Sequence, residues 1–133
     1  MKHLVLALGL CLAGMTPATA NEVEIQATIQ GQIDAFLADD FDQAFTFASP
    51  TIQAVFGSRD RFETMVRNGY PMVHRPANVR FLDLRTIDSE LWQKVQIRDV
   101  EGLYHIMDYK MINMNGDWLI NGVQLIPTPQ LGA

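Results

Sequence analysis

Apolar residues recur at the spacing of a helix through the first part of the chain after Asn21. Between Asn21 and Leu37 they fall on one helical face, which predicts an amphipathic helix. Asn21 is placed to cap its first turn, and Glu24 stands at the capping-box position three residues later. Asp39-Asp40 interrupts the pattern, and a second, shorter helix is expected to follow. The apolar positions are Ile25, Ile29, Ile33, Phe36 and Leu37, then Phe41, Ala44, Phe45 and Ala48.

Two further helices are indicated by their start and stop residues. Ser49-Pro50 is typical of a helix start, and Gly57 of a helix end. Ser58 is the expected cap of the next helix, which Gly69 would end. The first half of the chain is therefore predicted to be helical.

From Asn78 onward the apolar period changes from about four to two, which indicates strands. The clearest alternation sets Leu91, Val95 and Ile97 against Trp92, Lys94, Gln96 and Arg98. The pattern predicts a four-stranded antiparallel sheet in an α+β domain, with the helices packed on one side of a curved sheet. The expected strands are Val79–Ile87, the one around Leu91–Arg98, Leu103–Met114 and Trp118–Ile126, with turns at Asp88-Ser89, Glu101-Gly102 and Asn115-Gly116.

The first twenty residues have the pattern of a cleavable signal peptide: Lys2 and His3 give a positive start, an apolar run covers Leu4–Met15, and Ala18 and Ala20 suit the peptidase. A membrane anchor is the alternative, but this run is about half of the ~20 residues that a spanning helix requires. A lipoprotein signal at Cys11 is disfavoured because Leu10 precedes it. We therefore predict a signal peptide at 1–20 and one domain at 21–133 with a loose tail from about 128. We expect it to be periplasmic or secreted, without a stable membrane anchor after cleavage.

Charge and cysteine content exclude several classes of chemistry. The chain has ten Lys and Arg and fifteen Asp and Glu, a net charge of −5, and loss of Lys2 makes it −6. This sign argues against a nucleic-acid partner, since Lys and Arg supply most of that affinity. Cys11 is the only cysteine, so the expected mature chain has no disulfide and no thiolate ligand or nucleophile.

Two segments carry a family resemblance: Tyr70-Pro71-Met72-Val73-His74-Arg75-Pro76 between the halves, and Gly116-Asp117-Trp118-Leu119-Ile120-Asn121-Gly122-Val123 in the last hairpin. With helices preceding four strands, the chain resembles the bacterial family called domain of unknown function 4864 (DUF4864). That family is similar to the NTF2-like (SnoaL-like, cystatin-like) superfamily. The resemblance implies a cone closed by helices around a pocket. Relatives in the superfamily include isomerases, dehydratases, epoxide hydrolases, ligand binders and dimerising scaffolds, so the fold alone does not select a function.

The candidate pocket residues are Tyr70, His74, His105 and Tyr109. His105 and Tyr109 share the more apolar face of their strand with Leu103, and in such a cone they would point inward as donors or, for His105, as a proton carrier. A hydrogen-bonded core pair is the alternative. Tyr70 and His74 would line the mouth of the cone or form a rigid surface connection.

The sequence favours a binding protein over an enzyme. Asp83 and Asp108 fall on ambiguous or outward faces, so no inward carboxylate pairs with a histidine or tyrosine. The histidines are isolated, which disfavours a metal, and we expect no cofactor.

We therefore expect an exported, non-catalytic domain that binds a small apolar or amphipathic ligand or a protein partner. Trp92 and Trp118 indicate a homodimer through the sheet. An isomerase or dehydratase using a His/Tyr pair is the alternative, and a purely structural partner domain is a third hypothesis.

Overall fold

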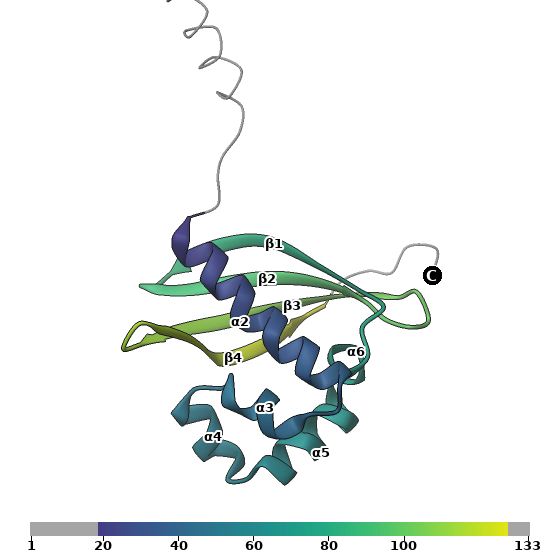
Figure 1. The fold of residues 1–133 in the computed structure, drawn as a ribbon. Coiled ribbons are helices and arrows are strands. Elements are labelled where there is room, and N and C mark those ends of the chain that lie inside the picture. The colour runs from purple at the N-terminus through teal and green to yellow at the C-terminus, as the bar shows by residue number, and fades with distance from the viewer. Residues whose placement is uncertain (1–18, 128–133) are drawn as a thin grey trace, which may run out of the picture.

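Five helices precede four strands in the computed structural model, which describes residues 19–127 (Figure 1). The helices are α2 (Ala20–Leu37), α3 (Phe41–Thr46), α4 (Pro50–Phe56), α5 (Arg59–Gly69) and α6 (Pro71–His74). The strands are β1 (Asn78–Ile87), β2 (Glu90–Arg98), β3 (Tyr104–Met114) and β4 (Asp117–Ile126). The predicted α+β class, with N-terminal helices and a four-stranded antiparallel sheet, is confirmed. Most of the predicted signal peptide, residues 1–18, and the predicted loose tail, residues 128–133, lie outside the described residues.

Side-chain caps set the starts of the first four helices. Ser49 and Ser58 accept hydrogen bonds from the backbone amides at the starts of α4 and α5, as the sequence predicts. Asp40 does the same for α3. The prediction for α2 was wrong by two residues: the cap is Thr19, whose hydroxyl accepts from the Glu22 amide at 3.0 Å, and not Asn21.

The four strands pair in the order β1-β2-β3-β4, each antiparallel to its neighbour. The turn after β3 has positive φ at Asn115 and Gly116, the geometry of a tight type I′ hairpin turn. Asp88 and Ser89 adopt the same left-handed region between β1 and β2 without the help of a glycine. The third strand begins at Tyr104, so the expectation that Leu103 lies inside it was wrong, and Leu103 is exposed.

The helices cover one face of the sheet, and the core lies between the two layers. Figure 1 shows α2 running diagonally across the sheet, with α3, α4 and α5 gathered beside β4. The register places Met107 beside Val95 and Tyr109 beside Gln93 on the covered face. These strand residues join apolar side chains of the helices in one core, which includes Ile25, Ile29, Ile33, Phe36, Phe41 and Phe62. None of the helices among residues 19–127 combines the length and apolar character needed to span a membrane.

Irregularities in two strands shape the sheet around this core. The register shifts between Phe81 and Leu84 in β1, and between Ile120 and Gly122 in β4, where β4 pairs with Lys110 and Met111 of β3. Such bulges bend a strand and increase its twist. Gln93, which no sequence pattern singled out, is fully buried and donates to the carbonyls of Leu82 and Lys94.

The segment after α3 is attached to the last strand. Ala48 forms an isolated parallel bridge with Ile120: the Ser49 amide donates to the Ile120 carbonyl, and the Ile120 amide donates to the Phe47 carbonyl. This pairing explains why α3 ends at Thr46, earlier than the apolar pattern predicts. It also fixes the start of α4 beside β4.

Candidate functional site

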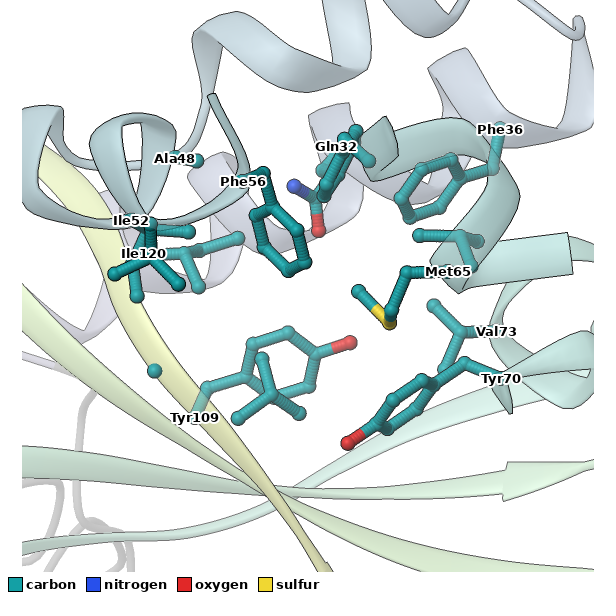
Figure 2. Close-up of a pocket in the computed structure, with 15 residues that line it drawn as sticks. Gln32, Phe36, Ala48, Ile52, Phe56, Met65, Tyr70, Val73, Tyr109 and Ile120 are labelled. Carbon is teal, nitrogen blue, oxygen red and sulfur yellow. The ribbon is translucent and has the colours of Figure 1, made fainter. Parts of the chain in front are cut away.

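A cavity of about 450 Å³ lies between the helices and the β3–β4 half of the sheet. Helices α2, α4, α5 and α6 contribute side chains to its lining, and the sheet contributes Tyr109, Ile120 and Val123 (Figure 2). Most of the lining is apolar, with Phe36, Phe56 and Met65 among its largest members. Ligand pockets commonly measure ~300–1,000 Å³, so this cavity has room for a small organic molecule.

Tyr109 lies on the sheet side of the cavity, and its polar hydroxyl is buried. Its side chain is 1 % exposed. Its hydroxyl makes no hydrogen bond with any described residue. In Figure 2 the hydroxyl points from β3 toward the middle of the cavity, in the direction of Met65. Burial raises the pKa of Tyr109 well above its ordinary value, and the neighbouring Tyr70 adds to this effect. Tyr109 is therefore a neutral phenol at physiological pH.

Gln32 supplies a second polar group from the helix side. Its side chain is buried, and its amide nitrogen donates to the Ala44 carbonyl at 3.1 Å. That bond fixes the orientation of the amide, and Figure 2 shows the side-chain oxygen directed into the cavity. Since this oxygen only accepts hydrogen bonds, while a phenol both donates and accepts, the two groups offer complementary chemistry.

No charged side chain is among the residues that line this cavity. Of the four candidates from the sequence, the structure brings Tyr70 and Tyr109 together in the lining, while His74 and His105 do not line it. The cavity lining therefore contains no group that titrates near neutral pH. It is suited to holding a neutral molecule.

His74 instead joins the end of α2 to α6. Its Nε2 donates to Asp39 Oδ1 at 2.8 Å, and Arg75 donates to the other oxygen of Asp39 at 2.8 Å and to the Phe36 carbonyl at 2.9 Å. The hydrogen bond from His74, together with the charge of Arg75, lowers the pKa of Asp39 below its usual value. The predicted surface connection is thus a helical turn with Val73 and His74 buried, because these polar contacts and the Phe41 ring hold it against α2.

His105 has a local role in the β2–β3 turn. Its Nε2 donates to Asp99 Oδ2 at 2.9 Å, while Asp99 Oδ1 accepts from the amides of Glu101 and Leu103. The bond from His105 and these two amides lower the pKa of Asp99. Although the register places His105 on the covered face, it lies near the start of β3 and stabilises the turn.

The far face of the sheet contains a partly buried ion pair. Asp108 was expected on an outward face, which suggested exposure, but it is buried. Arg85 reaches across β2 and binds both of its oxygens, at 2.9 and 2.7 Å. Trp92 lies nearby with the Lys110 ammonium 5.8 Å from its ring centre. Within residues 19–127 no group of three or more His, Cys, Asp or Glu is arranged to hold a metal ion.

A family model for a domain of unknown function, DUF4864, matches residues 18–133. The chain belongs to the DUF4864 family. No curated protein and no solved structure matches it. Membership in DUF4864 confirms the family resemblance seen in the sequence, and the family description assigns no activity.

Sequence reasoning missed several residues of the cavity in this DUF4864 domain. Gln32 and Met65 lie at helical positions that the hydrophobic pattern assigns to the surface or to the core. No neighbouring residue in the sequence indicates that they line a cavity. The signal that could have drawn attention to Gln32 is its place between Ile29 and Ile33 on the apolar side of α2. A polar residue in such a position needs a partner or a ligand.

Proposed function

We propose that this DUF4864 domain is exported and binds a small apolar or amphipathic molecule, without catalysis, in the cavity between the helices and the sheet. The observation that carries the proposal is an apolar cavity of about 450 Å³ with the unpartnered Tyr109 hydroxyl in its lining. A cavity with a largely apolar wall and a few convergent polar groups is the usual form of a small-molecule site. The enzyme alternative needs a histidine in the cavity, and both candidate histidines make their contacts elsewhere.

Fluorescence of N-phenylnaphthylamine, an uncharged apolar probe, tests for binding. We expect a saturable increase in fluorescence with the ligand-free domain. Val55→Trp places an indole at a position that lines the cavity and should weaken binding about tenfold or more. The matched control is Val100→Trp, because Val100 is similarly exposed, at 75 % against 72 %, and lies in the β2–β3 turn outside the cavity.

The proposal is wrong if the unmodified domain does not bind the probe, or if Val55→Trp and Val100→Trp bind it equally. Circular dichroism of both variants would establish that each is folded. Native mass spectrometry of protein taken from its own periplasm is a complementary measurement, since it reports a retained ligand directly.

We also propose that the cavity reflects an NTF2-like cone and that the domain forms a homodimer through its sheet. The helices on one face of a bent sheet, with a cavity between the layers, support the first proposal. The uncovered face, with Trp92 and the Arg85–Asp108 pair, would provide the interface. Light scattering at several protein concentrations tests for the homodimer, and a monomer at every concentration would refute it.

A further inference from the structure

We infer that the ligand of this cavity carries a neutral group that both donates and accepts a hydrogen bond, most simply a hydroxyl, at one end of a hydrocarbon body. This inference rests on the proposed function and specifies the class of ligand. It comes from the two polar groups of the lining, Tyr109 and Gln32, and from the lack of charge around them.

The Tyr109 hydroxyl is the donor that needs a partner. It is buried without a hydrogen bond, and leaving such a group unpaired is unfavourable. A ligand oxygen that accepts from it removes this penalty. The side chain toward which the hydroxyl points, Met65, is flexible and only half-buried, so a change of its rotamer lets a ligand atom approach.

Gln32 offers a hydrogen-bond acceptor to the polar end of the ligand. Its nitrogen is held by the Ala44 carbonyl, so its oxygen is the atom directed into the cavity. An oxygen of this kind only accepts, so a ligand group that bonds to it has to donate. An ether or a ketone accepts from Tyr109 but has no hydrogen to donate to Gln32, whereas a hydroxyl can bond to both.

The lining excludes charged ligand ends. It contains no arginine, lysine or histidine to neutralise a carboxylate, and no aspartate or glutamate to neutralise an amine. A buried charge without a partner is strongly unfavourable. The polar end is consequently neutral at physiological pH.

Displacement of bound N-phenylnaphthylamine by three ligands of similar size tests the inference. Octanol and heptyl methyl ether are isomers that differ in the ability to donate, and octanoate carries a charge at pH 8. We expect octanol to bind roughly two- to tenfold more tightly than the ether, the range that one hydrogen bond gives, and octanoate to bind more than tenfold more weakly than octanol.

Tyr109→Phe should weaken octanol binding roughly two- to tenfold relative to the binding of the ether. The matched control is Tyr104→Phe, on the uncovered face, which should leave the preference for octanol over the ether unchanged. If the probe binds and Val55→Trp weakens it, but octanol and the ether displace it equally or octanoate displaces it best, the ligand class is wrong and the proposed function stands. If the probe does not bind at all, the proposed function itself fails.

Discussion

Replacement of Tyr109 by Phe should make the ligand-free domain more stable. The tyrosine ring is packed in the core, and its hydroxyl is buried without a partner. Phenylalanine keeps the ring and removes only the oxygen. Most substitutions of buried residues destabilise a protein, so an increase in stability is a distinctive expectation.

The magnitude follows from two opposing contributions. An unpaired buried hydroxyl costs about 1–3 kcal/mol, which the substitution recovers. The space left by one oxygen, about 15 Å³, costs roughly 0.4 kcal/mol at 24 cal/mol per Å³. The free energy of unfolding should therefore rise by about 1 kcal/mol, and the melting temperature by roughly 4 °C for a domain of this size.

Urea unfolding followed by far-UV circular dichroism measures the effect. The protein is first unfolded and refolded to remove any retained ligand. The free energy of unfolding should fall with urea concentration at the same slope for Tyr109→Phe and for the unmodified protein. Tyr104→Phe serves as a control and should not increase stability. A decrease of 1 kcal/mol or more for Tyr109→Phe would show that the hydroxyl has a partner in solution, such as a buried water, and would refute the reasoning.

Three further predictions concern stability. Asp39→Asn should destabilise the domain at pH 7, and the difference from the unmodified protein should disappear as the pH falls below about 4. The reason is that the folded-state pKa of Asp39 is lowered from 3.8, so its stabilising effect is lost on protonation. Thermal unfolding at pH 7 and below pH 4 measures this, with Asp88→Asn as the control, because Asp88 is also at positive φ but has no ion pair among the described residues. Arg85→Met should lower the free energy of unfolding in urea by about 3 kcal/mol, because it leaves the Asp108 carboxylate buried and unpaired. The double variant with Asp108→Leu should recover most of this loss, and additive losses of the two single variants would contradict the prediction. Gly57→Ala should cost about 1 kcal/mol, since φ is +82° there although space is available, and an unchanged melting temperature would be inconsistent with this strain.

Local chemistry determined how much of the fold could be predicted. The caps Ser49 and Ser58, the stop at Gly57 and the Asn115-Gly116 turn act over three or four residues, so the sequence displays them directly. The turn Pro71–His74 was missed because four residues carry no periodicity, and its burial depends on Asp39 from a distant part of the chain.

The candidate site was harder to predict, because it forms through contacts between residues that are distant in the sequence. Tyr109 was placed on the covered face by alternation alone, and Tyr70 was proposed for the mouth of a cone. The positions of the histidines depend on Asp39 and Asp99, which approach them only in the fold. The ion-pair partner of Asp108 is similarly distant in the sequence, because Arg85 reaches it across an intervening strand.

The lack of buried side chains in α4 has a consequence for motion. Among the helices that line the cavity, α4 alone has no buried residue, whereas α2 buries six and is held at its end by Arg75. Segments with few buried contacts open at the lowest free energy, so the amide hydrogens of α4 should exchange with deuterium well before those of α2. The side of the cavity formed by α4 would then adapt to a bound molecule more readily than the side formed by α2.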